Sequence, residues 1–159
     1  MANTRPRPKG QGPIAPPEER EENKRIKELL GIPRTMAVVG MSPRLERPGR
    51  QVGTYLHTAG FEVVPVHPTA HDVSGLRAYR SLVDIPREKQ VDLVDVIVSA
   101  EHAGPVAEQA SEIGAKVIWF QPGAENPEEE QRARELGLEV FSGRCIMADH
   151  LRLIGDEAR

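Results

Sequence analysis

Short apolar runs alternate with longer amphipathic segments along most of this chain. The short runs are almost continuously apolar, which is typical of strands that are buried on both faces of a sheet. The longer segments repeat apolar residues at the spacing of a helix. The runs predict strands over residues 36–40, 61–66, 93–98, 116–120 and 138–141. The longer segments predict helices over residues 18–30, 51–59, 106–113 and 128–136.

Glycine ends three of the predicted helices directly before a strand, at Gly60, Gly114 and Gly137. A helix joined to the next strand by so short a connection is the repeating unit of parallel α/β proteins. The alternation therefore predicts an α/β fold with a doubly wound, mostly parallel sheet of five strands. This fold is Rossmann-like and has three layers, with helices on both faces of the sheet.

Length and composition are those of one domain with a tail. The chain has 159 residues, of which 38% are hydrophobic and 28% are charged. Residues 1–17 are rich in proline and glycine and carry Arg5, Arg7 and Lys9 without an acidic residue between them. Such a segment buries too little apolar surface to offset the entropy of ordering it. We expect a flexible tail over 1–17, either an unstructured leader or a contact for an anionic partner, and a single domain over 18–159.

Charge and hydropathy limit which binding partners and which cellular compartment we expect for this protein. The net charge is −3, so a broad basic face for nucleic acid is not expected. The apolar runs are too short to span a bilayer, and the first residues lack the apolar centre of a secretory signal. Cys145 is the single cysteine, which excludes a disulfide within the chain. We expect a cytoplasmic protein that contacts neither nucleic acid nor membrane, and a protein partner is left open.

Candidate ligand residues follow the predicted strands, because open parallel sheets bind ligands at the carboxyl ends of their strands. The loop after the first strand combines a glycine, the start of a helix and three arginines, which together suit a phosphate group. Its candidate binding residues are Gly40, Met41, Ser42, Arg44, Arg47 and Arg50. The alternative is a long surface loop whose arginines are only solvated.

The end of the second strand bears on the choice of nucleotide. A domain that binds NAD usually carries an acidic residue there for the ribose hydroxyls, and a G-x-G-x-x-G turn after its first strand. This chain has Val66, His67 and Pro68 at the strand end and lacks that turn. A partly cationic imidazole suits an additional ribose phosphate, which favours NADP or coenzyme A. Alternatively, His67 only bonds the backbone at the end of its strand.

The remaining strand ends supply small and polar candidates. The residues after the third, fourth and last predicted strands are Ser99, Gln121, Gly123, Arg144 and Cys145. A ligand in the crevice would meet them from one side of the sheet. Local structure is the alternative, because Ser99 can cap a helix and Asn126 with Pro127 can form an ordinary helix start.

Several short segments carry a resemblance that covers about residues 26–153. They are AVVG (37–40) with Ser42, RP (47–48), VPVHP (64–68), VDLVDV (91–96), VIWFQPG (117–123) and RCI (144–146) with His150. In this order and spacing they resemble the small stand-alone CoA-binding proteins of bacteria and archaea. The domain of that family is similar to the nucleotide-binding domain of the succinyl-CoA synthetase alpha subunit.

The resemblance implies that coenzyme A lies across the carboxyl edge of the sheet. It places the diphosphate on residues 40–42, beside the three arginines of that loop. The family usually has asparagine at the position of His67. The adenosine would lie near His67 and Pro68, and the pantetheine arm would run toward Gln121, Gly123 and Cys145.

A catalytic role would need an activated nucleophile with a base in reach. Cys145 and His150 lie close in sequence, and three interpretations of the cysteine compete. It is a packed residue, a neighbour of the CoA thiol that forms a mixed disulfide with it, or a nucleophile. A metal at His67, His71 and Asp72 is a further alternative.

We therefore predict a protein that binds coenzyme A or acyl-CoA and that is not catalytic by itself. The alternative function is an NADP-linked oxidoreductase or a redox sensor on the same fold. A third possibility is an interaction protein whose loop arginines serve only solubility. The first two differ in their ligand, so binding of CoA and of NADPH separates them.

Overall fold

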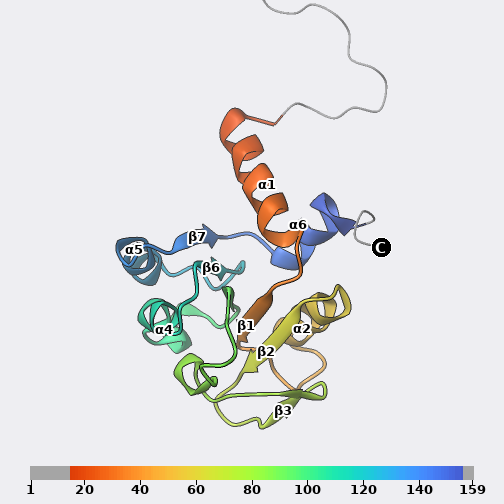
Figure 1. The fold of residues 1–159 in the computed structure, drawn as a ribbon, viewed down its shortest axis with the longest axis vertical. Helices are drawn as coiled ribbons and strands as arrows, with labels where there is room; N and C mark the ends of the chain where they lie inside the picture. The colour runs from red at the N-terminus through yellow and green to blue at the C-terminus, as the bar shows by residue number, and fades with distance from the viewer. Residues whose placement is uncertain (1–14, 156–159) are drawn as a thin grey trace, which may run out of the picture.

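The computed structural model describes residues 15–155 and contains one five-stranded parallel sheet (Figure 1). Its strands are β1 (Thr35–Val39), β2 (Glu62–Val66), β5 (Leu93–Val96), β6 (Val117–Phe120) and β7 (Glu139–Ser142). Their order across the sheet is β2-β1-β5-β6-β7, and every neighbouring pair is parallel. The predicted fold class is confirmed. A small antiparallel pair, β3 (Asp72–Val73) and β4 (Leu76–Arg77), was not predicted.

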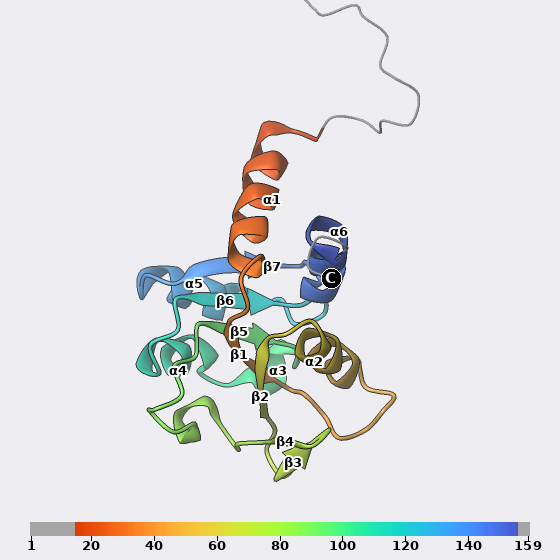
Figure 2. The ribbon, with the colours of Figure 1, turned by 45° about the vertical axis from the view of Figure 1, so that its right-hand side comes forward.

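Helices cover both faces of the sheet and complete the three layers (Figures 1 and 2). One core joins the sheet to α1 (Pro17–Leu30), α2 (Pro48–Thr58) and α6 (Ile146–Leu153). The second core joins it to α4 (Val106–Glu112), α5 (Pro127–Glu135) and the short 3-10 helix η1 (Leu82–Asp84). The four-residue helix α3 (Ala100–Ala103) follows β5. Figure 2 shows α1 extending away from the sheet at its N-terminal end.

The strands are apolar throughout because alternate side chains enter different cores. In β6, Trp119 packs in the core below α1, α2 and α6, whereas Phe120 packs in the opposite core. Both side chains are fully buried, and Trp119 stacks on Phe141 with ring centroids 4.8 Å apart. The apolar pair in β6 therefore belongs to the interior.

The edge strand β2 tolerates a proline because of its position in the sheet. Proline has no N–H to donate, so it suits the outer side of an edge strand. The carbonyl of Pro65 accepts a hydrogen bond from the N–H of Tyr79 (3.0 Å), and the N–H of His67 donates to the carbonyl of Tyr79 (2.9 Å). The segment around Tyr79 thus covers the carboxyl half of this edge.

Helix boundaries follow capping residues that are visible in the sequence. Asn126 caps α5, its side chain accepting a hydrogen bond from the N–H of Glu129, and Pro127 is the first helical residue. This cap confirms the local alternative considered for that turn.

Helix α2 begins at Pro48, three residues before the predicted start, because proline is favoured at the first helical position. The predicted tail lies outside the described residues up to residue 14. Within the described part of the chain, every helix is too short or too polar to cross a membrane.

Candidate functional site at the carboxyl rim of the sheet

The carboxyl ends of the five strands bring the candidate residues to one rim of the molecule. After β1 the chain moves outward to β2, and after β2 it returns to β5 on the other side of β1. The order of strands therefore reverses between β1 and β5, which is where open α/β sheets bind ligands. Figure 2 shows the loop between β1 and α2 projecting on the side toward which the strands run.

Gly40 lies at this reversal point and requires glycine for two reasons. Its φ angle is +103°, which side-chain-bearing residues rarely adopt. A Cβ atom at this position would lie 2.7 Å from Cγ1 of Val98 and 3.1 Å from its backbone nitrogen. The N–H of Gly40 donates to the carbonyl of Val66 (2.9 Å). The turn after β1 is thus held against the ends of both neighbouring strands.

Helix α2 packs directly on this turn through two glycines that the sequence analysis did not single out. A Cβ atom at Gly49 would lie 2.4 Å from the carbonyl oxygen of Gly40. A Cβ atom at Gly53 would overlap Met41, whose side chain is fully buried. Met41 therefore offers only its backbone to a ligand. The signal was the spacing of four residues between Gly49 and Gly53, which places both on one side of a helix.

The three arginines of the loop differ in how much of their side chain is exposed and in whether other residues bind it. Arg44 and Arg47 are exposed, and the nearest acidic group to Arg44 is Glu46 at 4.0 Å. Arg50 is half-buried and donates from a terminal guanidinium nitrogen to the carbonyl of Pro43 (2.8 Å). Arg47 is the N-cap of α2 and supplies no side-chain acceptor to that helix end. Positive charge and an N-terminal helix dipole therefore coincide beside Gly40.

His67 makes the backbone contacts that were considered as its alternative role. Its Nδ1 accepts hydrogen bonds from the N–H groups of Thr69 (3.2 Å) and Ala70 (3.0 Å). A ring nitrogen that accepts carries no proton, so the ring proton is on Nε2. In this arrangement the imidazole presents its other ring nitrogen as a donor at the rim.

Trp119 of β6 and Gln121, which directly follows that strand, hold the connection between β7 and α6. Gln121 is 5% exposed; its Oε1 accepts from the N–H of Ile146 (2.8 Å) and its Nε2 donates to Sγ of Cys145 (3.7 Å). The indole N–H of Trp119 donates to the carbonyl of Arg144 (2.7 Å). Cys145 is half-buried at the N-cap of α6. The structure thus brings the predicted pair Gln121 and Cys145 together.

Arg144 turns toward helix α1. Its guanidinium donates to both carboxylate oxygens of Asp149 (2.8 and 3.2 Å), to Glu22 (3.1 Å) and to Asn23 (3.3 Å). The hydrogen bond to Asp149 is the largest cause that raises the pKa of Arg144. Arg144 therefore joins α1 to α6, and a contact with a ligand stays a prediction for this residue.

Ser99 and Gly123 also have local partners. The hydroxyl of Ser99 lies 3.0 Å from Nδ1 of His102 and does not cap α3. Gly123 has a φ angle of +90°, and its N–H donates to the carboxylate of Glu125. Both residues lie just after strands, as expected.

His150 has partners other than the cysteine. Its Nδ1 lies 2.8 Å from the hydroxyl of Tyr55, and its ring meets that of Phe61 edge-on with centroids 5.6 Å apart. Burial lowers the pKa of His150, which favours the neutral ring. Within the described residues, no group of three His, Cys, Asp or Glu side chains is arranged to hold a metal ion.

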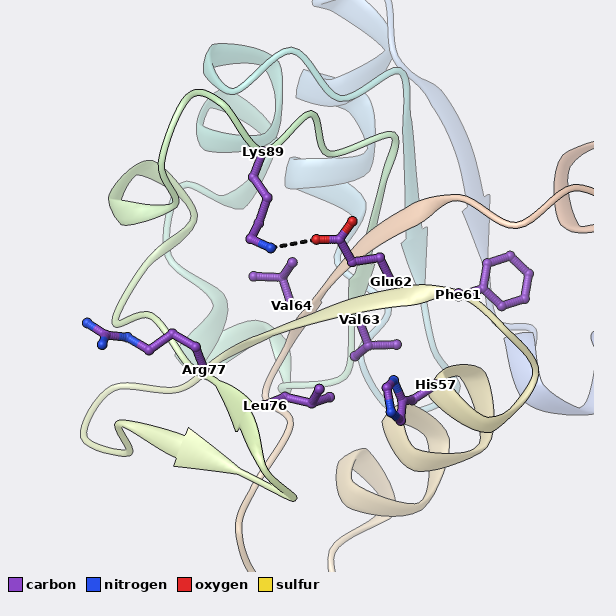
Figure 3. A pocket seen from close by; sticks show the side chains of 8 residues that line it. All are labelled: His57, Phe61, Glu62, Val63, Val64, Leu76, Arg77 and Lys89. Carbon is purple, nitrogen blue, oxygen red and sulfur yellow. Dashed lines mark hydrogen bonds and ion pairs between the residues drawn. The ribbon is translucent and has the colours of Figure 1, made fainter.

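Two hollows lie away from this rim, beside the amino half of β2. One has a volume of about 280 Å³ and is crossed by the ion pair of Lys89 and Glu62 (2.5 Å) (Figure 3). It is lined by His57, Phe61, Glu62, Val63, Val64, Leu76, Arg77 and Lys89. The other, of about 510 Å³, adjoins Thr35, Glu62, Pro86 and residues 88–90. Neither contains a candidate residue from the sequence.

The fold and the rim define the class of the protein as Rossmann-like α/β. The family model described as the CoA binding domain matches residues 34–151. The chain belongs to this family of CoA binding domains.

Its relatives include stand-alone proteins and parts of larger enzymes. Uncharacterized protein YneT of Bacillus subtilis is 37% identical over 125 residues, which are 79% of this chain and 91% of that protein. A solved hypothetical protein from Pyrococcus horikoshii has 36% identity and a TM-score of 0.80, covering 98% of this chain and all of that one. ADP-forming acetate–CoA ligase II of Archaeoglobus fulgidus is 31% identical over 124 residues. That match covers 70% of this chain but only 18% of the ligase.

Proposed function

We propose that the protein binds coenzyme A, free or acylated, across the carboxyl rim and does not convert it by itself. The observation that carries this proposal is the junction of Gly40, the N-terminus of α2 and the exposed guanidinium groups of Arg44 and Arg47. This junction presents backbone N–H groups and positive charge to a diphosphate in a chain whose net charge is −3.

The remaining parts of the ligand would lie on either side of this junction. Toward β2, the Nε2–H of His67 is a donor for the adenosine, next to Pro68. Toward β6 and β7, the pantetheine arm would run along Gln121 and Gly123 to the half-buried Cys145. Membership of the CoA binding domain family supports coenzyme A as the ligand.

The proposed role is to hold coenzyme A or its thioester for a protein partner in the cytoplasm. The similar ADP-forming ligases are much longer than this domain, so their activity is not transferred to this chain. The proposal of binding without turnover is supported by the contacts of the two obvious reactive groups, which bond other residues and not each other. Cys145 is bonded by Gln121, and His150 is bonded by Tyr55.

Titration of the purified protein with CoA and, separately, with NADPH tests the function. A ligand that binds only the folded state raises the melting temperature through its binding free energy. We expect CoA to raise it in a concentration-dependent way and NADPH to have little effect. A melting temperature unchanged at millimolar CoA would overturn the proposal. Mass spectrometry under native and denaturing conditions then shows whether CoA copurifies and whether it is attached to Cys145.

The Arg47→Ala variant tests the position of the diphosphate. A charge-assisted hydrogen bond contributes about 1.5–3 kcal/mol, so the dissociation constant for CoA should rise by about tenfold or more. Arg87→Ala is the matched control. Arg87 is also an exposed arginine of a loop, but it lies before β5, at the amino ends of the strands. Equal affinity of the two variants for CoA would remove Arg47 from the site.

A further inference from the structure

We infer that Leu45, at the tip of the loop between β1 and α2, is a ligand-binding residue that closes on the pantoyl methyl groups of coenzyme A. The inference rests on the proposed function and adds a residue and a specificity to it. It follows from the bonding within this loop, from the exposure of Leu45 and from the chemistry of the ligand next to its diphosphate.

Within the described residues, the loop of residues 42–47 is hydrogen-bonded only to itself and to the first turn of α2. The N–H of Arg44 donates to the hydroxyl of Ser42 (3.1 Å), and the N–H of Arg47 donates to the carbonyl of Arg44 (3.2 Å). The guanidinium of Arg50 donates to the carbonyl of Pro43 (2.8 Å). These bonds make residues 42–47 a small unit that is tied to the first turn of α2 and not to the sheet.

Both ends of this unit are fixed to the body of the protein. On one side, Met41 is fully buried against Gly53, and on the other, Gly49 lies against the carbonyl of Gly40. A segment that is anchored at its ends and bonded only to itself and to the adjoining helical turn can tilt toward the rim without losing hydrogen bonds to the sheet. The loop therefore has the freedom that closure over a ligand requires.

Leu45 is 73% exposed, the highest exposed fraction among the large hydrophobic residues of the described chain. It is flanked by Glu46 and by the exposed Arg44, with Arg47 two positions further on. The loop projects on the side of the strand ends, as Figure 2 shows. When two arginines hold a phosphate group, an apolar side chain between them can be buried on an apolar part of the same ligand. This burial stabilises the complex.

The structure of coenzyme A places an apolar group where Leu45 would meet it. The carbon that bears the two pantoyl methyl groups is separated from the diphosphate by one methylene, whereas the adenine is separated from it by the ribose. A residue between two diphosphate-binding arginines is thus nearer to these methyl groups than to the base. The loop selects a nucleotide diphosphate that carries a branched alkyl arm.

Calorimetric titration of Leu45→Ser tests this specificity with two ligands. One ligand is CoA, and the other is adenosine 3′-phosphate 5′-diphosphate, which lacks the pantetheine arm. We expect the variant to bind CoA about threefold or more weakly and the shorter nucleotide with a change below about 1.5-fold. Ile32→Ser is the matched control, because Ile32 is 60% exposed and precedes β1, at the amino ends of the strands.

Three outcomes are informative. CoA affinity unchanged in Leu45→Ser overturns the inference while the proposed function stands. Equal weakening for both ligands overturns it as well, since Leu45 would then act on the nucleotide and not on the arm. Failure of the unmodified protein to bind CoA overturns the proposed function and the inference with it.

Limited proteolysis gives a second readout of closure in the unmodified protein. Trypsin cleaves after Arg44, whereas the bond after Arg47 is protected by Pro48. Cleavage after the exposed Arg87 serves as the internal reference. We expect CoA to slow cleavage between Arg44 and Leu45 about fivefold or more relative to the reference, because closure orders an exposed loop. An unchanged ratio of the two rates would contradict closure.

Discussion

Gly49 of helix α2 lies so close to Gly40 that a Cβ atom there would be 2.4 Å from the Gly40 carbonyl oxygen. The contact joins the first helix of the Rossmann-like unit to the turn after β1, at the point where the order of strands reverses. It fixes the distance between the helix N-terminus and the turn, which are the two parts of the proposed diphosphate site. The geometry of the proposed diphosphate site therefore requires glycine at position 49.

The Gly49→Ala substitution should destabilise the protein and weaken CoA binding. Alanine is favoured over glycine in a helix by about 1 kcal/mol, but overpacking against a backbone carbonyl costs about 1–3 kcal/mol. We expect a net loss of up to about 2 kcal/mol in the free energy of unfolding, measured by denaturant titration. Thr54→Ala, at an exposed position of the same helix, is the control and should change little. A stabilised Gly49→Ala variant would show that the turn moves aside.

Removing the amide of Gln121 should release Cys145. In Gln121→Leu the N–H of Ile146 loses its acceptor and Sγ of Cys145 loses its donor. An unsatisfied buried group costs about 1–3 kcal/mol, so the free energy of unfolding should fall by that amount. The rate at which Cys145 reacts with a thiol reagent such as Ellman's reagent should rise severalfold. Gln131→Leu, at an exposed position of α5, is the control. Equal rates of Cys145 modification in both variants would show that Gln121 does not restrain the thiol.

Asp95 of the central strand β5 predicts a stability that depends on pH. It is fully buried between Val38 and Trp119 on the neighbouring strands, and both of its carboxyl oxygens lack a hydrogen-bond partner. Desolvation by burial raises the pKa of Asp95 well above its ordinary value. The folded state therefore holds the proton more tightly than the unfolded state.

The sign of the effect follows from this raised pKa. The contribution of Asp95 to stability is greatest below about pH 4, where the unfolded carboxyl is also protonated, and it falls as pH rises toward the folded pKa. Asp95→Asn, which stays neutral, should be more stable than the unmodified protein at pH 7. The difference between the two should shrink at lower pH when unfolding is measured across the series. A difference that is constant with pH would contradict this assignment.

Arg144 offers a way to separate a structural role from a ligand role. Its side chain is one-quarter exposed, and its ion pairs with Asp149 and Glu22 are therefore partly screened. Arg144→Ala should lower the free energy of unfolding by about 1–2 kcal/mol and increase hydrogen exchange in α1. Arg134→Ala on the exposed face of α5 is the control. If Arg144 also binds the ligand, the affinity for CoA falls in addition to the stability; if it only holds α1, the affinity is kept.

The strands and the layers were predictable because their signals are local, whereas the order of the strands came only from the structure. Continuous apolar runs such as residues 117–120 require burial on both faces, and the glycines after the helices leave room only for short connections. Gly40 was also predictable, since it ends an apolar run directly before an arginine-rich loop. The small β3–β4 pair was missed because strands of two residues carry no periodicity.

By itself, the sequence determined the parallel sheet, the rim at its carboxyl edge and the types of residue found there. Only the tertiary structure decided which of those residues are engaged by the protein. Arg144 meets Glu22 across 122 positions and His150 meets Tyr55 across 95. Such pairs depend on how helices pack across the sheet, and packing is a property of surfaces that periodicity along the chain does not encode.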